Sequence, residues 1–349
     1  MRVFRWFLMT FLAFSIVLTG CGGGGAGSDS QGSSGGDSAS GEPTETYKLN
    51  MSVTTGNQST WYKAAELFAN EVAEKTDGRI QISIFPNEQL SGGDQGKGVE
   101  MLIKGDTDLS YHSSIIYTII DERLGVVSAP FLFKNFDEVD QVLSGAGGEA
   151  LKAILREKGV EPLGFGQNGF RQITNSRNPI QKPEDLKGMK VRIPGMTMYI
   201  DLFKEFGADP VTMSFSEVYT SLQQGTIDGQ ENPIDVIHSS KLYEVQQYLT
   251  LWNYSYDPLV LGMNKKLFDS MHPSDQQVIM EAAAKANAYQ IQLAREEEAK
   301  QIQELKDAGM QVYEPTEEEL AAFQEIAKTI YDKYESIWGK ELLDAFMER

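Results

Sequence analysis

The run YKLNMSVTTGNQSTWYKAAELFANEVAEKTDGRIQISIF, residues 47–85, changes its hydrophobic period twice. Apolar residues alternate with polar ones over 47–53, which is the period of a strand. They then recur at helical spacing from Ser59 until Gly78, a residue typical of helix C-termini, and alternate again over 80–84. This strand–helix–strand order predicts an α/β layer with a mostly parallel sheet.

Candidate pocket residues follow from that layer, because ligands bind beyond the carboxyl ends of the strands in such sheets. Thr54 comes directly after the first strand. His112 and Ser113 lie at the corner that follows a later strand at 108–111. We therefore expect these three residues at a pocket rim.

The second half of the chain repeats the alternation. Strands are expected at 164–176, 190–193 and 259–263, and helices at 199–206 and 215–225. The run GTIDGQENP, residues 225–233, is expected to be a turn rich in hydrogen-bonding groups. The residues between Pro273 and Gly309 include no Gly or Pro. This predicts one very long helix that is able to brace two lobes. Two further helices are expected at 316–334 and 335–347.

The N-terminus is predicted to be a signal peptide, residues 1–20. Arg2 and Arg5 precede an apolar stretch at 6–18 that is too short to span a bilayer. It ends in LTGC, which resembles a bacterial lipobox with Cys21 as the lipidated residue. The alternative is an ordinary secretory signal with a chance cysteine. Residues 21–46 are rich in Gly and Ser and are expected to be a tether that holds the folded body, which begins near Tyr47, off the membrane.

Composition excludes several classes of function. The 349 residues carry 31 basic and 50 acidic side chains, a net charge of −19, which argues against binding to nucleic acid or electrostatic docking on anionic lipid. Three histidines and one cysteine leave no disulfide framework and no zinc-ligand cluster. We expect no metal and no cofactor.

Two arginines are candidate anion ligands. Arg192 lies between Val191 and Ile193 in a short strand that Pro194 ends, so its planar guanidinium is delivered at a strand end, where it suits a carboxylate. Arg171 offers a second positive charge in the run GFRQ. The alternative is that both are surface arginines in ion pairs.

Two residues of the run 215–233 are further candidates. Phe215 begins the predicted helix, and Asn232 is held rigid before Pro233. A pocket role is the more plausible reading for Asn232. Phe215 could equally be a core residue.

Three long blocks resemble the extracytoplasmic solute-binding subunits of TRAP (tripartite ATP-independent periplasmic) transporters. They are YKAAELFANEVAEKTDGRIQISIFPNEQL, GFRQITNSRNPIQKPEDLKGMKVRIPG and MSFSEVYTSLQQGTIDGQENPIDVIHSSKLYEVQQYLT. The likeness covers about residues 47–335. It implies a two-lobed, periplasmic-binding-protein-like α/β fold with hinge strands and a long lobe-spanning helix. Its lobe I would comprise 47–168 plus 257–273, its lobe II 169–256, and its spanning and C-terminal helices 274–349.

The resemblance also implies roles for residues. The family's carboxylate-clamping arginine falls on Arg192, a second pocket arginine on Arg171, an apolar wall on Phe215 and a polar ligand contact on Asn232. Relatives that bind sialic acid differ at Thr54 and Ser113. Together with His112 and Trp252, these departures suggest a differently shaped pocket and make sialic acid unlikely as the ligand.

The expected function is therefore capture of a small organic acid outside the cytoplasm, either in the periplasm or on the outer face of the cell membrane. A uronate, an aldonate, a four-carbon dicarboxylate or another short acid remains open. The expected partners are the membrane subunits of a TRAP transporter. A solute-binding sensor not coupled to uptake is the alternative. A hydrolase is disfavoured because no histidine has an evident nucleophile partner.

Overall fold

The computed structural model describes residues 43–347. The predicted signal peptide, the lipidation site at Cys21 and most of the predicted tether lie outside these residues. From Pro43 on, the chain forms one compact unit. Within the described part, no helix is both long and apolar enough to cross a membrane.

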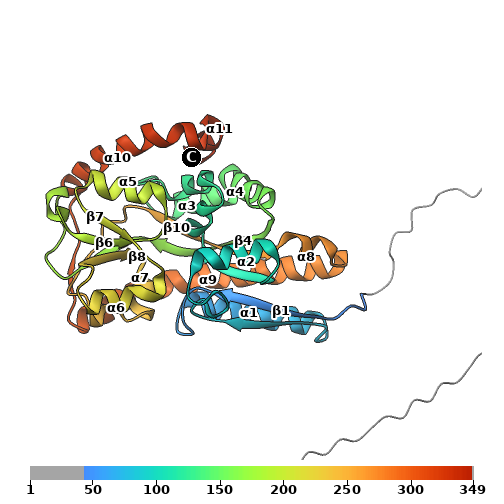
Figure 1. Cartoon of the computed structure of the whole chain (residues 1–349). Helices are drawn as coiled ribbons and strands as arrows, with labels where there is room; N and C mark the ends of the chain where they lie inside the picture. The colour runs from blue at the N-terminus through green and yellow to red at the C-terminus, as the bar shows by residue number, and fades with distance from the viewer. Residues whose placement is uncertain (1–42, 348–349) are drawn as a thin grey trace, which may run out of the picture. The chain divides into compact units, whose positions relative to one another are not determined.

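The first sheet has five strands and is built around the predicted strand–helix–strand unit (Figure 1). In spatial order its strands are β2 (Ile80–Phe85), β1 (Tyr47–Val53), β3 (Leu109–Ser113), β10 (Tyr256–Asn264) and β4 (Val160–Phe170). Strands β2, β1 and β3 run parallel, whereas β10 is antiparallel to both of its neighbours. The return of a late strand to the first sheet confirms the prediction for 259–263.

The second sheet has six strands. They are β11 (Gln311–Tyr313), β9 (Tyr248–Thr250), β5 (Gln172–Asn175), β8 (Gly229–Asn232), β6 (Lys190–Ile193) and β7 (Asp209–Thr212). Strands β6, β7 and β8 run parallel to one another. The turn predicted for 225–233 is therefore wrong in part, because β8 is a fully buried strand between β5 and β6.

Eleven α-helices are found in the described residues. They are α1 (Thr60–Lys75), α2 (Gln95–Lys104), α3 (Phe136–Ser144), α4 (Ala146–Glu157), α5 (Thr197–Glu205), α6 (Val218–Gln223), α7 (Ile234–Ser239), α8 (Lys265–Ser270), α9 (Pro273–Asp307), α10 (Glu317–Trp338) and α11 (Lys340–Met347). Helix α1 begins as the sequence predicts, because the Ser59 Oγ accepts a hydrogen bond from the Tyr62 amide and caps the helix. In Figure 1, α5 covers one face of the second sheet and α6 and α7 cover the other.

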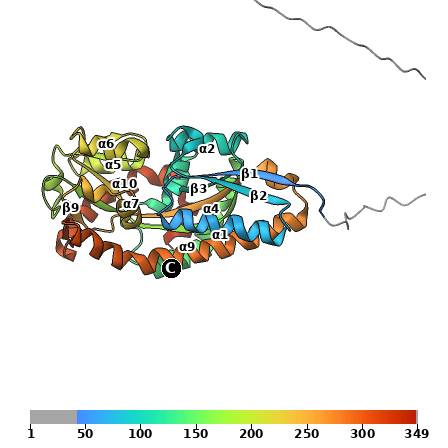
Figure 2. The ribbon, with the colours of Figure 1, turned by 90° about the horizontal axis from the view of Figure 1, so that it is seen from below.

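The long helix α9 spans both sheets, as predicted. Its first half packs into the core of the first sheet through Ile279, Ala283 and Ala286. Its last turns reach the core beside the second sheet through Leu305. Figure 2 shows α9 running beneath both halves of the body and alongside α1. One helix thus packs against the cores of both sheets.

The chain crosses between the sheets at Arg171 and again near Ser255. The single strand predicted for 164–176 is interrupted at Arg171, which separates β4 in the first sheet from β5 in the second. The Arg171 amide donates to the Ser255 carbonyl at 2.8 Å, so the two crossing segments are hydrogen-bonded to each other. These crossings have the geometry expected of hinge strands.

Candidate functional site

The carboxyl ends of the parallel strands in both sheets meet at one cavity. From the first sheet, β1 leads into Thr54 and β3 ends at Ser113. From the second sheet, β6 delivers Arg192 and β8 ends at Asn232. The cavity, as the term is used below, has thirteen lining residues: Thr54, Thr55, Trp61, Gln95, Ser113, Ile116, Asn168, Arg171, Arg192, Pro194, Phe215, Asn232 and Val236.

Six of the eight residues singled out from the sequence line this cavity. They are Arg192, Arg171, Asn232, Phe215, Thr54 and Ser113. They come from segments up to about 180 residues apart in the chain. Of these six, Thr54, Ser113 and Arg192 were singled out by the rule that ligands bind beyond the carboxyl ends of strands.

Arg192 is buried without a carboxylate partner. Its side chain is 2% exposed, and its Nε and Nη2 donate to the Met213 carbonyl at 3.2 and 2.9 Å. Its guanidinium carbon lies 5.7 Å from the centre of the Phe215 ring. Within residues 43–347 no acidic side chain forms an ion pair with it. Burial lowers the pKa of Arg192 to about 10, with Glu231 opposing that change and Arg171 adding to it. Arg192 therefore still carries its charge at neutral pH.

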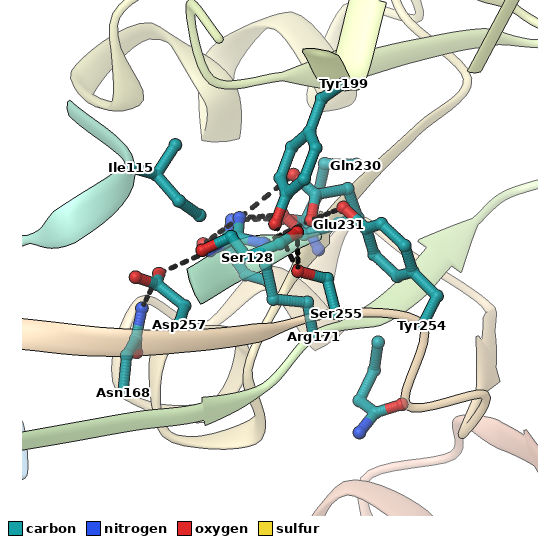
Figure 3. Close-up of polar contacts among 12 residues, drawn as sticks. Ile115, Ser128, Asn168, Arg171, Tyr199, Gln230, Glu231, Tyr254, Ser255 and Asp257 are labelled. Carbon is teal, nitrogen blue, oxygen red and sulfur yellow. Dashed lines mark hydrogen bonds and ion pairs between the residues drawn. The ribbon is translucent and has the colours of Figure 1, made fainter. Parts of the chain in front are cut away.

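Arg171 is equally buried but is surrounded by acceptors (Figure 3). Its Nε and Nη2 form a bidentate pair with the Glu231 carboxylate, and its Nη1 donates to Asp257 at 2.8 Å. Its Nη2 also donates to the Glu231 carbonyl and to the Asn232 Oδ1, at 2.9 and 3.2 Å. The two carboxylates hold the pKa of Arg171 well above its usual value despite burial.

The two carboxylates beside Arg171 have further donors of their own. The Tyr254 hydroxyl donates to Glu231 at 2.7 Å. Asp257 accepts from the Ser113 Oγ at 2.7 and 2.8 Å and from the Asn168 Nδ2 at 2.7 Å. Figure 3 shows Arg171 between these two groups. The arrangement fixes one wall of the cavity and leaves the Arg171 guanidinium committed to protein acceptors.

His112 lies behind the cavity and is not among its lining residues. Its neighbour Ser113 faces the cavity, and side chains alternate along a strand, so His112 points the other way. Its Nε2 is 2.9 Å from the Glu88 carboxylate, which also accepts from Thr54 at 2.7 Å and Ser52 at 2.9 Å. Burial would raise the pKa of Glu88, but His112 and these donors outweigh it and lower that pKa. His112 thus supports the wall that carries Thr54.

Trp252 is the second predicted site residue, after His112, that does not line the cavity. It is 1% exposed and packs in an aromatic cluster with Phe206, Tyr254 and Phe323. Sequence position alone could not reveal this, because β9 ends at Thr250 and the direction of the following side chains depends on packing.

Two residues missed by the sequence analysis line the cavity with unpaired polar atoms. The Trp61 Nε1 and the Asn168 Oδ1 are buried and have no hydrogen-bond partner within residues 43–347. Trp61 belongs to the apolar residues at helical spacing in α1, and it packs in the core beside the first sheet. The available signal was its place in the first turn of the helix after β1, at the carboxyl edge of the sheet.

The lobes touch across the cavity. The Ser216 Oγ, beside the second sheet, donates to the Gly93 carbonyl, beside the first sheet, at 3.1 Å. Asp235 in α7 accepts from the amide and the hydroxyl of Thr60 in α1, at 3.2 and 3.1 Å. The cavity itself measures about 20 Å³, and it adjoins hollows of about 230 and 220 Å³ with which it shares lining residues.

The side chains that line this cavity are of the kinds that bind small anions. It offers one guanidinium without a carboxylate partner among the described residues, three side-chain amides and three hydroxyls at the meeting point of two sheets. The residues lining the cavity include no histidine or cysteine. In the described part of the chain, no group of three His, Cys, Asp or Glu side chains is placed to hold a metal ion.

Comparison with known proteins agrees with this chemistry. Residues 51–337 match the family described as bacterial extracellular solute-binding protein, family 7. The 2,3-diketo-L-gulonate-binding periplasmic protein of Escherichia coli (strain K12) is 36% identical over 264 residues, which cover 76% of this chain and 80% of that protein.

Solved structures share the fold at high similarity. The sugar acid binding protein of Advenella mimigardefordensis strain DPN7T, in complex with galactonate, gives a TM-score of 0.84 at 34% identity and covers 87% of this chain and 97% of its own. A TRAP periplasmic solute binding protein of Sulfurospirillum deleyianum DSM 6946, with bound succinate, gives 0.82 at 27% identity and covers 87% and 99%.

Proposed function

The chain belongs to the bacterial extracellular solute-binding proteins of family 7, and on that premise we propose that it captures a small carboxylate-bearing solute for a TRAP-type transporter. Members of this family are extracytoplasmic binding subunits that work with TRAP membrane subunits, and they are not enzymes. The solute is a uronate, an aldonate, a dicarboxylate or a similar organic acid. The carboxylates bound by the similar proteins support this range.

The observation that carries the proposal is the unmatched charge of Arg192. A buried cation without an anionic partner is costly, and a bidentate carboxylate would satisfy its free donors. The protein is strongly acidic overall, so an approaching anion meets mean repulsion that only a local, desolvated positive group can reverse. Arg192 is that group, and Asn232, Thr54, Ser113 and Phe215 surround the rest of the solute.

Capture involves closure of two lobes around the cavity. We place the lobe boundaries at 168/169 and 256/257, beside the crossings between the two sheets. A cavity of about 20 Å³ holds about one water molecule, so the lobes must part before an organic acid can reach Arg192. Solute that bridges the lobes then shifts the population toward the closed form. Small-angle scattering should show a smaller radius of gyration with saturating ligand, and an unchanged radius would contradict closure.

The identity of the solute is the direct test. Mass spectrometry of compounds that co-purify with the protein should find an organic acid, and calorimetry with that compound should show one site. Co-purified compounds that bind tightly and lack a carboxylate would contradict the proposal. Loss of uptake of the same acid in a deletion strain supports delivery to a transporter, whereas unchanged uptake with loss of a response to the acid supports a sensor.

The attachment of the protein rests on the sequence alone. We propose that residues 1–20 are removed and that a lipid on Cys21 anchors the mature chain outside the cytoplasm. Cys21→Ala should release or misprocess the protein. A Cys21→Ala variant that stayed fully membrane-bound and normally processed would contradict the anchor and leave the binding proposal intact.

A further inference from the structure

The cavity and its two adjoining hollows contain few cations. The first hollow is lined by residues that include Asn87, Glu88, Ser239 and Tyr219, and the second by residues that include Asp94. Among the described residues, the only basic side chains that line any of the three spaces are Arg171 and Arg192. The number of carboxylates that the site can neutralise therefore depends on these two groups.

Only one of the two is available to a solute. Arg171 already faces two carboxylates, Glu231 and Asp257, and each of its three nitrogens donates to at least one of them. A solute carboxylate at Arg171 would have to compete with two buried carboxylates that have no other ion-pair partner in the described part of the chain. Arg192 is thus the single position for a negative charge. A second carboxylate in either adjoining hollow would share it with Glu88 or Asp94, and no basic side chain other than Arg192 lines those hollows among the described residues.

The unpaired polar atoms of the cavity are better satisfied by a hydroxyl than by a second carboxylate. The Trp61 Nε1 is a donor only, and its residue is 2% exposed. The Asn168 Nδ2 is bonded to Asp257, which leaves the Asn168 Oδ1 as a buried acceptor in a residue 5% exposed. A hydroxyl can both accept from an indole N–H and donate to an amide oxygen, whereas an ionised carboxylate can only accept.

The hollow beside the cavity continues the same pattern. Its lining shares Thr54, Gln95 and Phe215 with the cavity and does not include Arg192. Hydroxyls and amides predominate there, with Glu88 as the charged member. The Ser239 Oγ is buried there without a partner. This end of the site therefore suits neutral polar groups that can donate hydrogen bonds.

From these observations we infer that the solute is a monocarboxylate bearing hydroxyl groups, and that Trp61 and Asn168 select it over a dicarboxylate. The inference rests on the proposed function, since it assumes that Arg192 holds the solute's carboxylate. It makes Trp61 and Asn168 solute contacts that discriminate by hydrogen bonding, because rejecting a solute that leaves buried polar groups unpaired is more effective than rejecting one of different size.

Two matched sets of acids test the inference by calorimetry on the full purified protein, stripped of bound solute. The four-carbon set is erythronate, succinate and butyrate, and the six-carbon set is galactonate, adipate and hexanoate. In at least one set the hydroxylated monocarboxylate should bind ten times more tightly than the dicarboxylate and the plain acid. A dicarboxylate that binds as tightly as the hydroxylated acid in both sets would overturn the inference.

The variant Trp61→Phe tests the contact itself. It keeps an aromatic ring and removes the indole N–H, so affinity for the hydroxylated acid should fall about three- to tenfold. The matched control is Trp338→Phe, because the Trp338 Nε1 is also buried without a partner but lies outside the cavity. Its affinity should be unchanged. If Trp61→Phe does not fold, Asn168→Leu serves in its place, with the same direction expected.

The outcomes separate this inference from the proposed function. Tight dicarboxylate binding that Arg192→Ala abolishes would overturn the selectivity and leave the carboxylate site intact. Acid binding that survives Arg192→Ala would overturn the proposed function and the inference together. Binding of none of the six acids would also overturn both, and equal affinities of Trp61→Phe, Trp338→Phe and the native protein would overturn the role of Trp61.

Discussion

Arg171 and Arg192 lie on the same cavity and are equally buried, yet their surroundings differ. Arg171 is held between Glu231 and Asp257, whereas Arg192 has the Met213 carbonyl and the Phe215 ring. The first arginine completes its charge balance within the protein. Among residues 43–347 the second has no acidic partner, and on the proposed function its charge is balanced by the bound solute. We therefore expect a structural role for the arginine at the crossing strand and a recognition role for the one at the strand end.

The strongest test of the difference between the two arginines is to make the same substitution at both positions. Arg171→Met should destabilise the fold by about 3–5 kcal/mol, because it leaves two carboxylates buried without a cation. Arg192→Met should change the free energy of unfolding by less than about 1 kcal/mol, because the cation it removes has no carboxylate partner in the protein. Urea unfolding of the two variants without solute measures the difference. Equal losses of stability would show that both arginines are structural.

The second test measures the solute affinity of Arg192 variants instead of their stability. Arg192→Ala should weaken binding of the co-purified acid by about 2–5 kcal/mol, because the solute carboxylate would be buried without its partner. Arg192→Lys keeps the charge but loses the planar fork of donors. Its affinity for the acid should therefore lie between that of the native protein and that of Arg192→Ala.

Calorimetry at one salt concentration measures these affinities, with the unfolding temperature of each variant as the control for folding. Were Arg192→Ala to bind within about threefold of the native protein, a difference below about 1 kcal/mol, the clamp would have to be placed elsewhere. Arg171 would then be the first candidate, despite its two carboxylates.

Asp235 extends the comparison to a buried anion without a cationic partner. It accepts from the amide and hydroxyl of Thr60 at the N-terminus of α1 and from Gln301 in α9. Burial raises the pKa of Asp235 above its ordinary value, against the hydrogen bonds from these groups. The folded state therefore holds a proton more tightly than the unfolded state does.

The sign of the resulting pH dependence follows from that difference. The stability contributed by protonated Asp235 is full below the unfolded pKa, about 3.8, and is lost as the pH rises through the raised folded pKa. Asp235→Asn should lack this loss, so its stability relative to the native protein should improve with rising pH across that window. Unfolding curves measured from pH 4 upward test this, and parallel stability profiles would contradict it.

The sequence predicted much of this site because strand ends can be read locally. The rule that ligands bind beyond the carboxyl ends of strands singled out Thr54, Ser113 and Arg192, and all three line the cavity. Strand β8 was missed because GQEN is polar and Gly-containing, and its burial comes from pairing with β5 and β6. The ion pairs of Arg171 could not be predicted from the sequence either, because Glu231 and Asp257 are 60 and 86 residues away in the chain.

A substitution of Trp252 has the smallest expected effect on solute affinity. It tests the prediction from the sequence that Trp252 is a site residue. The sequence analysis named Trp252 as a pocket residue and did not single out Trp61. The structure places Trp252 among Phe203, Phe206 and Phe323, away from the cavity. Trp252→Phe should therefore change solute affinity by less than about twofold, well below the cost of losing a hydrogen bond to the solute. Any loss of stability from the smaller ring should appear in unfolding and not in binding. A larger loss of affinity in Trp252→Phe than in Trp61→Phe would mean that the aromatic cluster shapes the pocket, as the sequence suggested. The contrast between the two arginines would then not account for solute recognition on its own.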